Sequence, residues 1–155
     1  MPKLDVSFIQ QKGAGYCLPA CVQMVLAFNG MQRSQEDIAM QLGIIEDAGI
    51  PASRVLRLTS RQLDVTRRKG EPEDLLRSLA DSTPPIVEVQ TNQMAYWNGE
   101  ATAHVVLLAA TQDDAGKQYA IVNDPAFDGP KTVLMGELIL AWDDMQNLCA
   151  TIRRK

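Results

Sequence analysis

The first half of the chain shows the apolar spacing of amphipathic helices. From residue 17 to residue 29, apolar residues recur every three or four positions, at Leu18, Cys21, Val22, Val25 and Leu26. Proline is tolerated in a first helical turn and glycine commonly follows a last turn, so Pro19 and Gly30 mark the two ends of one helix. The pattern predicts a buried helix that begins near Cys17.

Three more helices are expected in this half. Ser34 followed by Asp37 is typical of a capped helix start, and Gly43 marks the end of that helix. Apolar spacing predicts a third helix over residues 52–62 and a fourth over residues 72–80.

The second half is instead rich in short runs of valine, isoleucine and leucine. These runs predict strands at 86–89, 104–110, 119–122, 131–134 and 149–152, with a turn at 113–117 and one late helix at 137–142. Helices therefore come first, and strands in antiparallel succession follow. This segregation predicts an α+β fold rather than an alternating parallel-sheet fold.

Composition narrows the class of protein. The chain has 155 residues, 46% of them hydrophobic, which suits one domain over residues 1–155. The net charge of −4 argues against a nucleic-acid surface, and the short basic clusters at 67–69 and 153–155 are expected to be solvated. No apolar run approaches the roughly 18 residues of a membrane helix, and the N-terminus lacks a secretion signal. No membrane segment and a cytoplasmic location are therefore expected.

Cysteine and histidine are too scarce for most metal or disulfide sites. Three cysteines are an odd number, so a closed disulfide framework is not expected, and a single histidine leaves little material for a metal centre. Core packing is the expected role of Cys21 and Cys149, with a resolving thiol as the alternative for Cys21. At least one cysteine needs another explanation.

Cys17 opens the first predicted helix directly after a glycine loop at residues 12–15. Unpaired backbone N–H groups and the positive end of the helix would surround its sulfur. They stabilise the thiolate, which is the nucleophilic form of cysteine. The alternative is a cysteine that only packs at the start of a helix.

His104 is the only histidine in the chain and begins an apolar strand. Any acid–base work by imidazole near neutral pH must therefore fall to it. Asp124 ends the next predicted strand, and the turn near Asp114 lies halfway between the two. A tight hairpin places the start of one strand beside the end of the next, so His104 and Asp124 are expected within hydrogen-bond reach. A packed histidine and an ordinary strand-ending aspartate are the alternatives.

Two further side chains are candidates for the same site. Gln11 precedes Cys17 across the glycine loop, and its amide with the backbone N–H of Cys17 would form an oxyanion hole. Gln10 is a rival for this role, and a plain surface glutamine is the alternative. Trp97, in the loop before His104, is a candidate substrate contact, with a packed tryptophan as the alternative.

These motifs together resemble one known family. A glutamine, a cysteine that opens a buried helix, a distant His-Val-Val strand and an Asn-Asp-Pro segment are similar to those of the bacteriocin-processing peptidases. These are papain-like cysteine proteases that remove double-glycine leader peptides, often as domains of export transporters. The resemblance covers the chain from Gln11 to Ile152. It implies a papain-like fold with N-terminal helices packed on a C-terminal antiparallel sheet, and a free-standing domain is expected because the chain ends at Lys155.

The resemblance also implies a cysteine peptidase that acts on a peptide or protein substrate. Cys17 would be the nucleophile, His104 the general base, Asp124 its orienting carboxylate and Gln11 the oxyanion residue. Water would hydrolyse a thioester intermediate, and no metal or organic cofactor is expected.

Two other functions use the same features. The same cysteine, histidine and aspartate would perform transamidation or acyl transfer if an amine replaced water as the acceptor. The domain would alternatively be a non-catalytic peptide-binding module that retains the fold. The presence of all four site residues argues against the binding module, because mere binding gives no reason to keep them.

Overall fold

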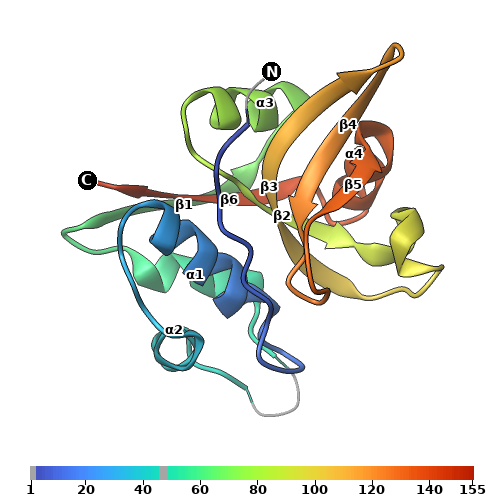
Figure 1. The fold of residues 1–155 in the computed structure, drawn as a ribbon. Coiled ribbons are helices and arrows are strands. Elements are labelled where there is room, and N and C mark those ends of the chain that lie inside the picture. The colour runs from blue at the N-terminus through green and yellow to red at the C-terminus, as the bar shows by residue number, and fades with distance from the viewer. Residues whose placement is uncertain (1–2, 46–48) are drawn as a thin grey trace.

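An antiparallel sheet of six strands runs through the molecule (Figure 1). The computed structural model describes residues 3–45 and 49–155. In spatial order the strands are β1 (Leu63–Lys69), β6 (Leu148–Arg154), β2 (Ile86–Gln90), β3 (Ala103–Asp114), β4 (Lys117–Asn123) and β5 (Lys131–Leu134). Every neighbouring pair is antiparallel. The predicted α+β class is confirmed.

Helices cover both faces of this sheet. The α-helices are α1 (Cys17–Phe28), α2 (Gln35–Leu42), α3 (Pro72–Ala80) and α4 (Met135–Asp143), and the 3-10 helices are η1 (Ala52–Leu58), η2 (Thr91–Gln93) and η3 (Ala95–Trp97). One hydrophobic core joins α1, α2 and η1 to one face of the sheet, and a second joins α3 and α4 to the other. The predicted packing of N-terminal helices on an antiparallel sheet is therefore confirmed for one face, while α3 and α4 cover the other.

The apolar sequence of β3 follows from its place between these two cores. Successive side chains of a strand point to opposite faces of the sheet. Val105 and Leu107 accordingly join the core beneath α1, whereas Val106 and Leu108 join the core beneath α4. A strand that is buried on both faces is apolar at nearly every position. This burial fixes the strand that carries His104.

The helix that begins at Cys17 forms as its sequence predicts. Its apolar residues are buried, and Pro19 lies in the first turn, where no intrahelical donor is lost. The chain leaves the helix through Gly30, whose φ of +77° is the left-handed conformation that glycine adopts without strain. The position of Cys17 at the N-terminus of α1 is thus fixed by the packing of the whole helix.

Two local predictions are wrong. The helix expected over residues 52–62 is the 3-10 helix η1, which ends at Leu58. Its two buried residues, Val55 and Leu58, are three positions apart, and this spacing suits a 3-10 helix of three residues per turn. The chain then turns at Ser60, whose hydroxyl accepts hydrogen bonds from the N–H groups of Gln62 and Leu63, and enters β1, a strand that was not predicted.

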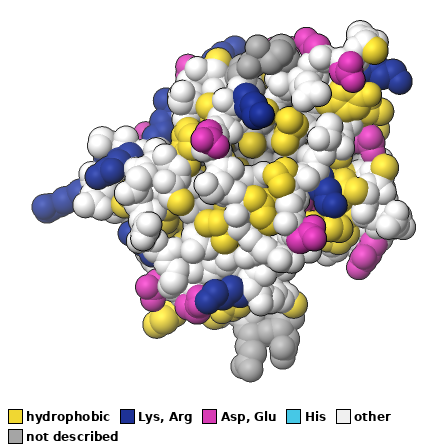
Figure 2. Space-filling view, viewed as in Figure 1, with side chains coloured by type: hydrophobic (Ala, Val, Ile, Leu, Met, Phe, Trp, Pro, Cys, Tyr) yellow, Lys and Arg dark blue, Asp and Glu magenta, His cyan; other side chains and the backbone are white. Residues whose placement is uncertain are grey.

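The strand β1 also corrects the expectation for one residue of the basic cluster at 67–69, since Arg68 and Lys69 are exposed as expected but Arg67 is not. Arg67 lies on the inward side of β1 and makes two hydrogen bonds to Glu88 of β2, at 2.8 and 3.0 Å. Glu88 is buried, so this ion pair is an internal feature rather than solvated charge. The cluster at 153–155 is exposed as expected, and Figure 2 shows Lys and Arg side chains gathered where β6 ends. Within residues 3–45 and 49–155, no helix has the length and apolar character needed to cross a bilayer.

Candidate active site

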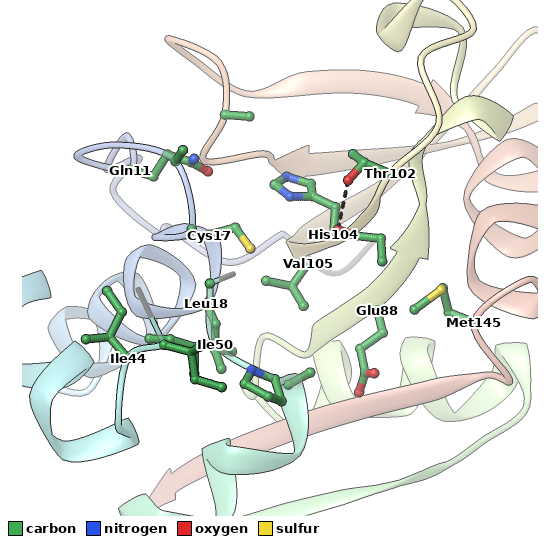
Figure 3. A pocket seen from close by; sticks show the side chains of 18 of the residues that line it. Gln11, Cys17, Leu18, Ile44, Ile50, Glu88, Thr102, His104, Val105 and Met145 are labelled. Atoms are coloured by element: carbon green, nitrogen blue, oxygen red, sulfur yellow. Dashed lines mark hydrogen bonds between the residues drawn. The ribbon is translucent and has the colours of Figure 1, made fainter. Parts of the chain in front are cut away.

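A cavity of about 820 Å³ lies between the start of α1 and the sheet. Figure 3 shows Leu18, Ile44 and Ile50 on the helical side of this cavity and Glu88, Val105 and Met145 on the sheet side. Four of the residues singled out in the sequence line the same cavity, namely Gln11, Cys17, Trp97 and His104. Segments from distant parts of the chain therefore meet here.

Cys17 reaches this cavity from the N-terminus of α1. The N-cap residue Tyr16 makes no side-chain capping bond, and the first turn holds no acidic residue. The positive end of the helix is therefore not neutralised by a side chain of its own. Such a helix end stabilises an anion placed beside it, and the sulfur of Cys17 occupies this position.

His104 lies at the start of β3 and faces Cys17. Its Nε2 atom is 2.7 Å from Oδ1 of Asp124, which confirms the predicted proximity of these two residues. Because Nε2 is engaged there, Nδ1 is the ring nitrogen left for the thiol. Figure 3 shows the side chain of Cys17 pointing toward His104. The three side chains thus stand in the order sulfur, imidazole, carboxylate.

The surroundings of His104 favour its charged form. Burial by itself lowers the pKa of this imidazole, since only 8% of the residue is exposed. The hydrogen bonds to Asp124 and Cys17, together with the charges of both groups, outweigh burial and raise the pKa of His104 to about 9. These interactions therefore favour the imidazolium form of His104 at neutral pH.

Asp124 is completely buried and uses both carboxylate oxygens. Oδ1 accepts hydrogen bonds from His104 and from the backbone N–H of Ala126, at 3.1 Å for the latter. Oδ2 accepts from the hydroxyl of Tyr96 at 2.6 Å and from the indole Nε1–H of Trp97 at 2.9 Å. Burial acts to raise the pKa of Asp124, but these hydrogen bonds and the charge of His104 lower it overall. The carboxylate stays ionised and fixed in orientation.

Trp97, the candidate substrate contact, donates a hydrogen bond to Asp124 in addition to lining the cavity. Its ring also stands edge-on to the imidazole of His104, with ring centroids 5.2 Å apart. Tyr96, which sequence reasoning missed, comes from the same 3-10 helix η3. The available signal was two aromatic residues with polar tips shortly before the only histidine. A contact of Trp97 with substrate stays a prediction.

Gln11 lies opposite His104 across the mouth of the cavity. Figure 3 shows its amide pointing toward the part of the cavity that holds Cys17 and the imidazole. Nε2 donates to the carbonyl of Gly13 at 2.9 Å, while Oε1 is buried and has no hydrogen-bond partner among the described residues. The rival Gln10 is exposed. The geometry therefore favours Gln11 over Gln10 as the residue that contacts a ligand.

The other two cysteines lie in the cores, as predicted. Cys21 is fully buried, and its Sγ lies 3.8 Å from the carbonyl oxygen of Val105. Burial raises the pKa of the Cys21 thiol well above its ordinary value and that of Cys149 to about 11. All three cysteines are free. In the part of the chain that the structure describes, no cluster of three or more histidine, cysteine and acidic residues is placed to bind a metal.

Comparison with solved structures finds this fold in several peptidases. A double-glycine motif protease from an AMS/PCAT transporter, solved in complex with its leader peptide, is 23% identical, with a TM-score of 0.72, and the match covers 99% of this chain and 94% of that one. A C39-like peptidase from Bacillus anthracis is 16% identical, with a TM-score of 0.71 and coverage of 98% and 97%. The peptidase domain of Streptococcus ComA, a bifunctional ABC transporter in a quorum-sensing pathway, is 17% identical, with a TM-score of 0.73 and complete coverage of both chains.

These likenesses confirm the predicted papain-like fold. A search of curated proteins found no significant match. The sequence itself matches the model of the Peptidase C39-like family over residues 3–150. The expected resemblance to double-glycine leader peptidases and the expected class of enzyme are both confirmed by these findings. The chain belongs to the Peptidase C39-like family, and its class is that of a cysteine peptidase.

Proposed function

We propose that this protein hydrolyses a peptide bond with Cys17 as nucleophile, His104 as acid and base, and Asp124 as the carboxylate that orients the imidazole. The observation that carries the proposal is the 2.7 Å contact between His104 Nε2 and Asp124 Oδ1 beside a cysteine at a helix N-terminus. Nucleophile, base and orienting group within hydrogen-bond reach are the signature of covalent catalysis by acyl transfer.

The resting site holds a thiolate and an imidazolium. The pKa of His104, raised to about 9, keeps the proton on the imidazole at neutral pH, and the end of α1 stabilises the negative sulfur. The thiolate attacks the substrate carbonyl carbon, and the charge moves to the carbonyl oxygen. His104 then gives its proton to the departing amine as the carbon–nitrogen bond breaks, which leaves a thioester on Cys17.

Water completes the reaction. The neutral imidazole of His104 takes a proton from water as the water oxygen attacks the thioester carbonyl, and the sulfur departs as the thiolate. Gln11 Nε2 and the backbone N–H of Cys17 stabilise the oxyanion in both steps. The proton that left with the amine is replaced by the one taken from water, so the site returns to its starting state and water is the only co-reactant consumed.

The proposed substrate is a peptide of the double-glycine leader type. A solved relative with this fold is a double-glycine motif protease bound to its leader peptide. The cavity of this chain offers Leu18, Ile44 and Ile50 as apolar contacts for such a peptide. Apolar lining with a few placed polar groups is typical of a site that binds a peptide and holds one bond for chemistry.

The test is to incubate the protein with synthetic leader peptides that end in Gly-Gly followed by a short cargo segment, and to identify products by mass spectrometry. We expect cleavage after the second glycine, and no cleavage when both glycines are replaced by valine. An amide adduct formed with added glycinamide in preference to the acid product would favour transamidation. Saturable peptide binding without turnover would favour the binding module and overturn hydrolysis.

Replacement of Gln11 by alanine should weaken the reaction without abolishing it. Loss of one oxyanion donor typically costs about 10²–10³ in kcat. We expect a loss in this range with little change in KM, measured by steady-state cleavage of the leader peptide. Gln10→Ala, at the exposed neighbouring residue, is the matched control and should keep wild-type rates. Equal rates for Gln11→Ala and the wild type would remove Gln11 from the oxyanion hole.

A further inference from the structure

Gln35 is a buried glutamine whose side chain holds the loop that carries Gln11. It is the first residue of α2 and is 2% exposed. Its Nε2 donates to the carbonyl of Gln10 at 2.9 Å, and its Oε1 accepts from the backbone N–H of Lys12 at 3.0 Å. The two backbone bonds therefore lie on either side of Gln11.

A third bond connects the same amide to the nucleophile helix. Nε2 of Gln35 also donates to Oε1 of Gln23 on α1, at 3.0 Å. Both amide hydrogens and the amide oxygen of Gln35 are thus in use. A reversed amide would bring its oxygen against two other acceptor oxygens, so the orientation of Gln35 is fixed by its partners.

The backbone of Gln11 is held from a further direction. Its N–H donates to the carbonyl of Pro125 at 2.8 Å, and Pro125 directly follows Asp124. Gln11 is therefore tied to the residue after Asp124 by its own backbone, and to α1 through Gln35. The side chain of Gln35 completes a link between three parts of the site that are distant in sequence.

We infer that Gln35 is a positioning residue for the oxyanion hole: it sets the place of the Gln11 amide relative to Cys17 without touching substrate. This inference rests on the proposed function. An oxyanion donor works only within about 2.7–3.1 Å of the developing negative oxygen. A displacement of about 1 Å costs on the order of 10² in rate, so a brace on this loop acts directly on turnover.

The experiment replaces Gln35 by methionine, which has a similar volume and makes none of the three hydrogen bonds. Gln41→Met, the same change at an exposed position of α2, is the matched control. We expect kcat for leader-peptide cleavage to fall by about 10- to 10²-fold in Gln35→Met, with KM changed by less than about threefold. Alkylation of Cys17 by iodoacetamide should keep its wild-type rate, because that reaction forms no oxyanion.

The decisive comparison uses the double variant. If Gln35 acts through Gln11, then Gln35→Met added to Gln11→Ala costs little beyond the loss from Gln11→Ala alone. If Gln35→Met lowers kcat in the Gln11→Ala variant by as much as it does in the wild type, the inference is overturned. It is also overturned if Gln35→Met alone keeps the wild-type kcat. Gln35→Glu keeps an acceptor for Lys12 N–H and loses both donors, and it serves in place of methionine if Gln35→Met does not fold.

Hydrogen exchange separates this inference from the proposed function. In Gln35→Met the backbone amides of Gln11 and Lys12 should exchange at least about tenfold faster, a factor of the order that one lost hydrogen bond is worth. Unchanged exchange overturns the positioning role, whether or not the peptide is cleaved. If the wild type cleaves no leader peptide but these amides exchange faster in Gln35→Met, the positioning role of Gln35 is upheld and the proposed hydrolysis is overturned.

Discussion

Cys17→Ser should reduce kcat for peptide cleavage by on the order of 10⁶-fold. Serine keeps the shape of the side chain, but its hydroxyl is far less acidic than a thiol. The helix end and His104 therefore no longer supply an anionic nucleophile. The rate is measured by single-turnover cleavage of the leader peptide with enzyme in excess.

The matched control lies one helical turn further on. Cys21→Ser makes the same change at a buried cysteine whose sulfur lies near the carbonyl of Val105, to which a hydroxyl can donate. We expect this variant to keep activity within about threefold of the wild type. Activity retained in Cys17→Ser, or lost equally in Cys21→Ser, would show that Cys17 is not the nucleophile.

Asp124→Asn is expected to have the second largest effect, a loss on the order of 10³–10⁴-fold in kcat. Asparagine keeps the shape of aspartate but removes its charge. The carboxylate accepts four hydrogen bonds, from His104, Ala126, Tyr96 and Trp97. Wherever the asparagine NH₂ is placed, it faces donors. The imidazole then loses both its orienting partner and the charge that raises its pKa.

The pH profile identifies the cause of that loss. The raised pKa of His104 should give the wild type an alkaline limb in kcat near pH 9, where the imidazolium loses the proton it gives to the leaving amine. In Asp124→Asn this limb should move to lower pH. Asp128→Asn, an exposed aspartate in the same loop, should leave rate and profile unchanged. An unmoved alkaline limb in Asp124→Asn would contradict the assigned pairing.

The pKa shifts of His104 and Asp124 also make the free energy of unfolding depend on pH. Because the pKa of His104 is raised in the folded protein, its contribution is complete below its unfolded value of about 6.5 and is lost as the pH rises through about 9. Because the pKa of Asp124 is lowered, its contribution is present above about 3.9 and is lost as the pH falls through its folded value. The pair therefore supports the fold most fully between about pH 3.9 and about pH 6.5, and its support declines from there to about pH 9.

The sequence predicted the contact between His104 and Asp124 because it depends on chain geometry alone. A two-residue turn at Ala115 and Gly116, both at positive φ, lies near the midpoint between them. The start of α1 at Cys17 was equally predictable, because apolar spacing indicated the helix, and Pro19 and Gly30 marked its two ends. Features of this kind follow from patterns within one segment or one hairpin.

Other features depend on pairs of residues from distant segments and left no periodic signal. The strand β1 was missed because its third inward position is Arg67, which is polar in the sequence and is matched by Glu88 only in the folded sheet. The donors on Asp124 come from the irregular segment that holds Tyr96 and Trp97. Nothing in the sequence distinguishes Gln35 from the other glutamines, because its three hydrogen-bond partners come together only in the folded protein.

The proposed mechanism requires that His104 hold Cys17 as a reactive thiolate. The most direct test is the rate of Cys17 alkylation by iodoacetamide as a function of pH, read by mass spectrometry, in the wild type and in His104→Ala. Cys21 and Cys149 serve as internal references, because burial raises the pKa of each thiol. We predict fast labelling of Cys17 well below the ordinary thiol pKa of about 8.5, slowed markedly by loss of His104. Labelling of Cys17 no faster than that of the other two cysteines, or unaffected by His104→Ala, would show that Cys17 is not a thiolate activated by His104.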